Sequence, residues 1–214
     1  MKQRSLAIAI PGESMPLEAV RCYGRLMLRF MSHPIPRLSH LSQAMFSASI
    51  LPYARAKVVE MALSQGASHV LMLDTDMTYP ETLVERLLAH DRPFVACNAT
   101  TRRPPIRWCA KDKAGHEMDS SKGRGLQKAG SCGLAVALIE RRVFEAIPTP
   151  RFFFEWTGAG WRGEDIWFCD RAIERGFQPM IDHDLSREIG HVGIHTYTCE
   201  DVAGSAQADE PSPI

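Results

Sequence analysis

The chain has 214 residues, of which 45% are hydrophobic, so it is long enough to bury the core of one domain without disulfide staples. Its 25 basic and 25 acidic side chains cancel, so net charge favours no polyionic partner and only local charge is informative. No apolar run approaches the roughly 18 residues that a membrane-spanning helix needs, which argues against a membrane protein.

The six cysteines contain no Cys-x-x-Cys pair, and several lie among apolar residues, as buried free thiols do. This pattern predicts a reducing cytoplasm. The charged start and the apolar residues 5–10 are too short for a signal peptide and end at Pro11. We therefore expect a first strand there and a cytoplasmic protein.

Strands and helices alternate in the first half of the chain. The predicted strands are short apolar runs at residues 6–10, 38–45, 70–73 and 94–97. The predicted helices have apolar residues three or four apart and cover residues 17–31, 54–64 and 80–90. Gly24 is expected to interrupt the first helix, and Gly66 to end the second.

The second half continues the alternation, with strands at 134–139 and 179–181 and helices at 140–147 and 165–175. This order predicts a single α/β domain over residues 1–200. Its sheet should be twisted and mainly parallel, with helices on both faces and one right-handed crossover after another. Residues 201–214 are small, polar and proline-bearing, which predicts a disordered tail.

Two carboxylates, Asp74 and Asp76, follow the apolar strand at 70–73. Ligands of parallel sheets bind outside the carboxyl ends of the strands, so both acids fall where a ligand would lie. Together they can hold one hard cation that carries a diphosphate. The pattern favours nucleotide chemistry, although an acidic turn after a strand is the plain structural alternative.

Three further segments contain glycine beside a polar residue. The sequence Gly-Ser-Cys-Gly ends at Gly133, Gly-Glu-Asp ends at Asp165, and His191 lies in Gly-His-Val-Gly. Each alone has a structural interpretation: a tight turn, an acidic helix start that complements the helix dipole, and a structural histidine.

Taken in order, these segments resemble the nucleotide-sugar-dependent glycosyltransferases of the GT-A fold, especially the small inverting enzymes of bacteria and their phages. The resemblance reaches from about residue 6 to residue 198, and its motifs lie at residues 51–55, 73–76, 133–145, 163–165 and 191–193. It implies transfer of a hexose from a nucleoside-diphosphate sugar, with a UDP-sugar as the first choice, to a hydroxyl acceptor.

The resemblance also implies a metal site. Asp76 matches the principal metal ligand, Asp74 its ribose or metal partner, and His191 a C-terminal metal-binding histidine. An imidazole ligand suits Mn²⁺ better than Mg²⁺, so manganese is the expected cation and magnesium the alternative. Competitors for the role of His191 lie nearby at His183, Asp184 and His195.

The Gly-Glu-Asp segment matches the position of the general base of an inverting transfer. Asp165 is the candidate base, with Glu164 in reserve. Trp156 and Trp161 flank this segment, and their aromatic faces can bind acceptor rings, or they belong to the core.

Donor contacts are implied at three further positions. Arg55 matches an arginine that contacts the donor, and Pro11 lies where the nucleobase pocket begins. Gly133 matches a glycine beside the donor sugar, where a missing side chain permits close backbone approach.

Residues 101–130 lack regular periodicity and contain eight Lys or Arg against three acids. This stretch could contact a phosphate backbone, close over the anionic donor, or be a solvated loop. Arg102 and Arg103 are candidate acceptor contacts. A hydroxymethylated base in DNA is therefore one candidate acceptor, and a saccharide or small molecule is the alternative.

Other classes fit less well. A sugar-phosphate nucleotidyltransferase would carry a glycine-rich basic loop, which residues 10–14 lack. A non-catalytic nucleotide- or nucleic-acid-binding module remains an alternative. Zinc could be held by four residues whose spacing matches no common structural site, namely Cys97, Cys109, His116 and Cys132.

Overall fold

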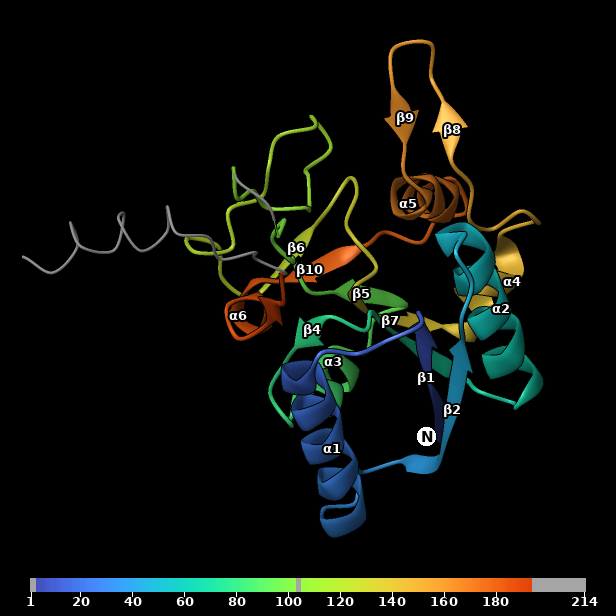
Figure 1. Ribbon diagram of the computed structural model, residues 1–214, viewed down its shortest axis with the longest axis vertical. Coiled ribbons are helices and arrows are strands. Elements are labelled where there is room, and N and C mark those ends of the chain that lie inside the picture. The colour runs from blue at the N-terminus through green and yellow to red at the C-terminus, as the bar shows by residue number, and fades with distance from the viewer. Residues whose placement is uncertain (1–2, 103–104, 194–214) are drawn as a thin grey trace, which may run out of the picture.

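The structure is a computed structural model that describes residues 3–102 and 105–193 (Figure 1). Within these ranges a seven-stranded sheet runs in the order β2-β1-β3-β7-β5-β10-β6. Strands β1, β2, β3, β5 and β10 share one direction, and β7 and β6 run the opposite way. The chain therefore has an α/β fold with a mostly parallel sheet.

The central sheet is built from strands β1 (Arg4–Pro11), β2 (Leu38–Phe46), β3 (His69–Leu73), β5 (Phe94–Ala96), β6 (Leu126–Lys128), β7 (Val136–Glu140) and β10 (Met180–Asp182). Two small ladders join β4 (Met77–Thr78) to β11 (Gly190–His191) and β8 (Glu155–Trp156) to β9 (Trp161–Arg162). The helices are α1 (Leu17–Ser32), α2 (Leu51–Ser64), α3 (Leu83–Ala89), α4 (Arg141–Ala146), α5 (Glu164–Glu174) and α6 (His183–Ser186). None of the helices in the described ranges is both long and apolar enough to cross a membrane.

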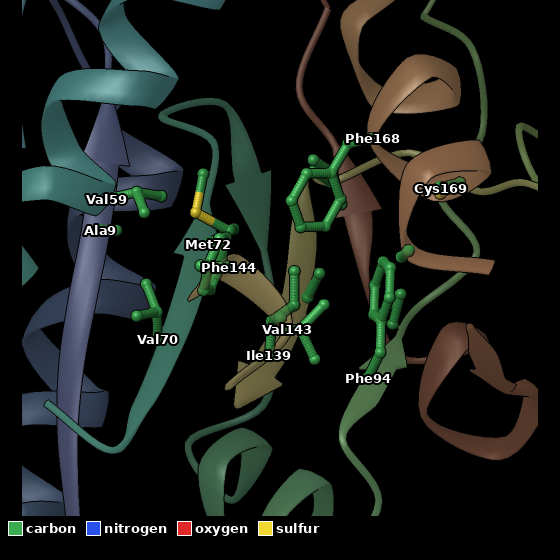
Figure 2. Close-up of a cluster of buried hydrophobic side chains, with 14 of the residues drawn as sticks. Ala9, Val59, Val70, Met72, Phe94, Ile139, Val143, Phe144, Phe168 and Cys169 are labelled. Carbon is green, nitrogen blue, oxygen red and sulfur yellow. The ribbon is translucent and has the colours of Figure 1, made fainter. Parts of the chain in front are cut away.

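Strand β3 lies between two cores because successive side chains of a strand point to opposite faces. Val70 and Met72 belong to the core shared with α2, α4 and α5, which Figure 2 shows. Leu71 and Leu73 belong to the core shared with α1 and α3. All four side chains are fully buried, so the end of β3 is held rigidly where the Asp-Thr-Asp turn begins.

Each strand and helix expected from the sequence is present with ends within about three residues. One topological expectation is wrong: β7 pairs antiparallel with both β3 and β5, so the chain does not make one parallel crossover after another. An apolar run buried on both faces carries no information about strand direction. Gly24 also fails to interrupt α1, because a lone glycine lowers helix stability without breaking the hydrogen-bond ladder.

The irregular segment between β5 and β7 is pinned by the buried side chain of Asn98. Its amide donates to the carbonyl of Met118 at 2.7 Å and to Oγ of Ser120 at 3.0 Å, and its oxygen accepts from the Ala110 amide at 2.8 Å. The segment has no periodic apolar pattern that would form a helix or strand, and the hydrogen bonds of Asn98 hold it in place instead. The expected tail, residues 201–214, and the end of the expected domain lie outside the described residues.

Candidate functional site

The Asp-Thr-Asp turn begins where β3 ends. The Asp74 amide donates to the carbonyl of Ala135 at 2.8 Å, which ties the turn to the segment before β7. Gly12 follows Pro11 at the end of β1, and a Cβ at Gly12 would lie only 2.6 Å from Cγ2 of Thr75. The loop after β1 therefore packs directly on the turn, which places Pro11, at the end of β1, near the turn.

A buried guanidinium links this turn to α5. Arg55 on α2 donates from Nη2 to Oδ2 of Asp74 at 3.0 Å and from Nε to Oε1 of Glu164 at 3.0 Å. The Arg55 side chain is 3% exposed and that of Glu164 is 7% exposed. Burial disfavours the charged form of Arg55, but the charges of Asp74 and Glu164 outweigh it, so the pKa of Arg55 is raised.

Asp165, the neighbour of Glu164, lies in the first turn of α5 beside Gly133. A Cβ at Gly133 would lie 3.8 Å from Oδ2 of Asp165 and 3.9 Å from Cβ of Cys109. Oδ1 of Asp165 accepts from the Ile166 amide at 2.7 Å, which leaves Oδ2 turned toward Gly133. Burial and then the charge of Glu164 raise the pKa of Asp165. Because Glu164 is held by Arg55, Asp165 is the better placed of the two carboxylates to accept a proton.

Asp76 faces two cationic partners across the turn. Arg102 donates to Oδ2 of Asp76, and Nε2 of His191 lies 3.4 Å from the same oxygen. The Nδ1 of His191 lies 2.7 Å from the carbonyl of Thr100, so Nδ1 must be the donor and Nε2 is directed at Asp76. The β4 to β11 ladder produces this contact by pairing His191 with Met77.

These contacts shift both ionisation equilibria. Burial works against ionised Asp76, but the hydrogen bond and charge of His191, together with Arg102, prevail and lower the pKa of Asp76. The hydrogen bond to Asp76 raises the pKa of His191 against the effect of burial. The pair therefore favours a carboxylate beside an imidazolium when no cation is bound.

A metal ion fits only part of the expected ligand set. Within residues 3–102 and 105–193, no three His, Cys, Asp or Glu side chains are grouped to hold a metal ion. Asp76 and His191 converge on one point and supply the oxygen and nitrogen ligands that Mn²⁺ accepts. Asp74 is turned to Arg55 instead, so a bound cation would take its remaining ligands from the diphosphate and water.

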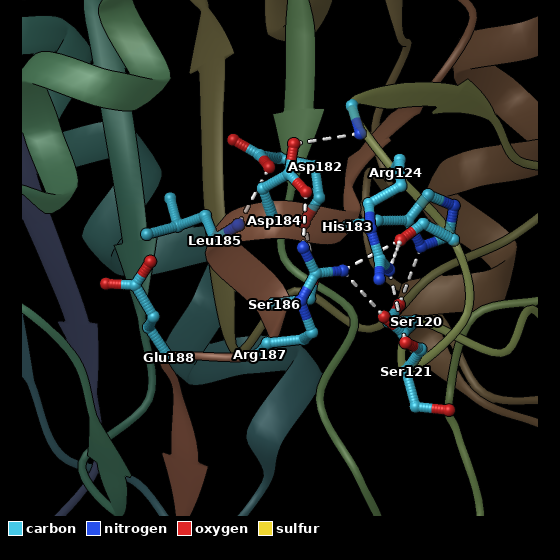
Figure 3. Close-up of polar contacts among 12 residues, drawn as sticks. Ser120, Ser121, Arg124, Asp182, His183, Asp184, Leu185, Ser186, Arg187 and Glu188 are labelled. Atoms are coloured by element: carbon cyan, nitrogen blue, oxygen red, sulfur yellow. Dashed lines mark hydrogen bonds and ion pairs between the residues drawn. The ribbon is translucent and has the colours of Figure 1, made fainter.

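The competing candidates for the role of His191 lie elsewhere, as Figure 3 shows for His183 and Asp184. His183 faces Oγ of Ser120 at 2.8 Å and Oε1 of Gln127 at 2.9 Å, which is a structural role. Asp184 accepts from the Gly125 amide at 2.9 Å. His195 lies outside the described residues.

The two tryptophans expected at the acceptor side lie on the β8 to β9 hairpin, which projects beyond α5 (Figure 1). Trp156 is 57% exposed and Trp161 is 72% exposed, so neither belongs to the core. Their ring centroids are 5.4 Å apart in an edge-on arrangement. Trp161 precedes Asp165 by only four positions, so the rings lie close to the candidate base along the chain.

The basic stretch presents less free charge than its composition suggests. Arg107 pairs with Glu117 at 3.3 Å, and Lys122 pairs with Asp119 at 3.2 Å. Arg124 donates to main-chain carbonyls at residues 121–123. Of the two expected acceptor contacts, Arg102 lies on Asp76 and Arg103 falls outside the described residues.

The four residues considered for zinc are not grouped around one point among the described residues. His116 has 79% of its side chain exposed and faces Asp112. Cys132 instead lies beside Cys169 with the sulfur atoms 3.8 Å apart, and this hydrogen bond together with burial raises the pKa of Cys132.

Sequence reasoning missed the pairing of Arg102 with Asp76 and the contact of Thr100 with His191. No local pattern marks either residue, since both contacts depend on the β4 to β11 ladder, whose strands have two residues each. The Pro-Gly pair at residues 11–12 indicates a turn, but it does not indicate that Gly12 packs on Thr75.

Comparison with known proteins gives information about the fold alone. No protein-family model and no curated protein matches the chain. The crystal structure of A197 from STIV is similar with a TM-score of 0.56 at 16% sequence identity, over 92% of this chain and 97% of that one. The likeness spans nearly the whole of both chains, so the two proteins share an α/β architecture.

Proposed function

We propose that this chain is a metal-dependent, inverting glycosyltransferase of the GT-A type, which moves a hexose from a nucleoside-diphosphate sugar to a hydroxyl acceptor. One observation carries the proposal. The Arg55 guanidinium joins Asp74, in the turn after β3, to Glu164, the immediate neighbour of Asp165. Carboxylates from chain positions far apart are thus held together at the edge of the sheet where parallel α/β proteins bind ligands.

Donor binding is assigned to the turn and the loop after β1. Pro11 and Gly12 supply one wall for the nucleobase, and Asp74, oriented by Arg55, faces the ribose. Asp76 and His191 would hold Mn²⁺, or Mg²⁺, which offsets the negative charge of a departing diphosphate when it is bound. Gly133 leaves room for the donor sugar beside Oδ2 of Asp165.

The transfer itself needs one base. The acceptor oxygen attacks the anomeric carbon from the side opposite the diphosphate, and the new carbon–oxygen bond forms as the old one breaks. The bonding electrons leave with the diphosphate oxygen, and the acceptor proton passes to Oδ2 of Asp165. Burial and Glu164 raise the pKa of Asp165, which strengthens its carboxylate as a base.

The acceptor is assigned to the side of the hairpin. Exposed aromatic rings offer a stacking surface for a sugar or nucleobase ring, and Trp156 and Trp161, on the hairpin that precedes α5 in the chain, provide one. Arg107 and Lys122 are already paired with acids, so they offer little free positive charge to a DNA backbone. A saccharide acceptor does not need that charge, so we favour it. The hydroxymethylated base in DNA, which the sequence suggested first, therefore becomes the second candidate acceptor.

Incubation with Mn²⁺ and a panel of nucleotide sugars, UDP-sugars first, tests the proposal through released nucleoside diphosphate and mass spectrometry of the products. We expect donor hydrolysis without acceptor and faster release with the right acceptor. Asp76→Ala should abolish both, and Asp112→Ala, in an exposed turn, should leave both unchanged.

Oligosaccharides and DNA with hydroxymethylcytosine, compared with plain DNA, separate the acceptor classes. Nucleotide-sugar binding with no turnover of any donor would instead support a non-catalytic binding module. Full activity in Asp76→Ala would end the metal-dependent proposal.

A further inference from the structure

A cavity of about 480 Å³ lies at the edge of the sheet opposite the Asp-Thr-Asp turn. His69, the first residue of β3, lines it together with Glu140, its partner at the end of β7. Asp74 follows the other end of β3. A five-residue strand spans roughly 16 Å, so this cavity is separate from the candidate donor site.

Four arginines line the cavity: Arg4, Arg37, Arg141 and Arg142. Two of them are held in place by main-chain oxygens. Arg4 donates from Nη1 to the carbonyl of Leu88 at 3.2 Å, and Arg141 donates from Nη1 to the carbonyl of Leu63 at 2.9 Å. A carbonyl orients a guanidinium without cancelling its charge, so these two cations are fixed before any ligand arrives.

The cavity also contains three carboxylates, each paired with one arginine. Asp91 pairs with Arg4, Glu145 with Arg141 and Glu140 with Arg142. The fourth arginine, Arg37, is exposed and makes no side-chain hydrogen bond or ion pair within residues 3–102 and 105–193. The cavity therefore contains one more arginine than acids, and the guanidinium of Arg37 is available to a ligand.

The backbone is strained at this cavity. Arg37 has φ of 69° and Asp91 has φ of 50°, and these are the non-glycine residues with positive φ in the described chain. Both line the cavity. Arg4 joins them, because its amide donates to the Arg37 carbonyl at 2.7 Å and its guanidinium pairs with Asp91. Strained non-glycine residues gather at ligand sites, where the surroundings hold them in place.

We propose that this cavity is a second binding site, which takes the phosphate group of a ligand through Arg37 and Arg142. Arg142 donates to Glu140 through Nε, and its guanidinium lies 5.8 Å from the centroid of the Phe177 ring. Its terminal nitrogens make no hydrogen bond within the described residues, so they can bind two oxygens of a phosphate side by side. The volume suits a phosphomonoester of about nucleotide size. The phosphate can belong to a free small molecule or to a nucleic-acid backbone, and the two sources share this chemistry.

Thermal unfolding with inorganic phosphate, at constant ionic strength with chloride as the balancing ion, tests the free source. Anisotropy of a labelled single-stranded oligonucleotide tests the backbone source. We expect at least one probe to bind, Arg37→Glu with Arg142→Ala to weaken it roughly tenfold, and Arg37→Ala to weaken it less. The matched control is Arg25→Glu, on the exposed face of α1, which should bind as the parent does.

Asp76→Ala distinguishes this cavity from the candidate donor site. Binding that survives Asp76→Ala and is lost in the Arg37 and Arg142 variants supports the proposal, whichever probe reports it. The proposal is overturned if neither probe binds, if the arginine variants bind like the parent, or if Asp76→Ala alone removes binding. None of these outcomes depends on glycosyl transfer.

Discussion

At the scale of single residues, the site depends on how Arg55 is surrounded. A guanidinium that is 3% exposed lies between the carboxylates of Asp74 and Glu164. Such buried pairs contribute little net stability when complete, since desolvation offsets their attraction. Removing one partner is costly, because an unpaired charge stays behind in a medium of low dielectric constant.

We therefore predict that Arg55→Met lowers the free energy of unfolding by about 3 to 5 kcal/mol, because the buried carboxylate of Glu164 and the partly buried one of Asp74 lose their counter-charge. Urea unfolding measures the change. Arg55→Lys should recover part of the stability but little of the transfer activity, since an ammonium group cannot bind both acids in a fixed geometry. Lys57→Ala, an exposed change on the same helix, is the control, and an Arg55→Met protein as stable as the parent would contradict the account.

Arg102 gives a prediction about metal affinity. Its guanidinium lies on the Asp76 oxygen that a divalent cation would use, and its side chain is 52% exposed. Exposed ion pairs contribute up to about 1 kcal/mol, so Arg102→Ala should bind Mn²⁺ up to roughly fivefold more tightly. Calorimetric titration with Mn²⁺ alone measures this, with Arg25→Ala as control. Weaker Mn²⁺ binding in Arg102→Ala would mean that the arginine helps to assemble the site instead.

Asp165 gives a prediction about pH. Its pKa is raised by burial and by Glu164, and a base works only when deprotonated. Activity should therefore fall on acidification through a pKa above the usual aspartate range, as the acid limb of kcat/KM against pH. Asp165→Asn should lower kcat by roughly a hundredfold or more.

The same shift has a consequence for stability. A carboxyl whose folded pKa lies above its unfolded value binds protons more readily in the folded state, so its contribution is lost as pH rises through the folded pKa. Above that pKa the ionised Asp165 therefore costs stability, and at such a pH Asp165→Asn should unfold at a higher temperature than the parent. Unchanged kcat with unchanged stability would remove Asp165 from the role of base.

At the scale of elements, buried apolar runs and helix punctuation made much of the fold predictable. Strand β3 has an apolar run that is buried on both faces, and α2 ends just before Gly66, whose φ of 80° suits glycine. The direction of β7 was not predictable, because an apolar run buried on both faces fits a parallel and an antiparallel neighbour equally well. Nor were β4 and β11, which depend on pairing between segments more than a hundred residues apart.

For the candidate site, the sequence named residues, and the structure shows which of them lie together. Motif order indicated Asp76, Asp165 and His191, and the fold brings Asp76 and His191 within 3.4 Å. The partners that orient these groups, such as Arg102 and Thr100, had no sequence signal. Both residues contact the site only through tertiary structure. Because the sequence around them has no periodic pattern, these contacts could not be predicted from it.

Asn98 tests how the irregular segment is held. Its side chain is 1% exposed and makes three hydrogen bonds to residues 110, 118 and 120. We predict that Asn98→Ala lowers the free energy of unfolding by about 3 kcal/mol, because buried polar groups lose their partners. Hydrogen exchange at the Ala110 amide should quicken more than at β3 amides. Ser121→Ala, at an exposed position, is the control, and equal protection of Ala110 in Asn98→Ala would show that other contacts hold the segment.

At the scale of the whole molecule, β3 connects two polar regions of opposite character. Acidic groups gather after its carboxyl end, and arginines gather around its amino end. Basic and acidic residues are equal in number over the chain, so each region acts through local charge and not through a field of the whole protein. The strand between them is fully buried from Val70 to Leu73 and has no titratable side chain after His69.

This separation predicts that the two regions bind their ligands independently. Sites more than about 10 Å apart that share no partner usually contribute additively to stability. UDP with Mn²⁺ and inorganic phosphate should each raise Tm, and both together should raise it by the sum of the separate shifts. Asp76→Ala should remove only the first shift, and Arg37→Glu with Arg142→Ala only the second. A combined shift clearly different from the sum would show that β3 transmits a change between the two ends of the sheet, because no described side chain lines both sites.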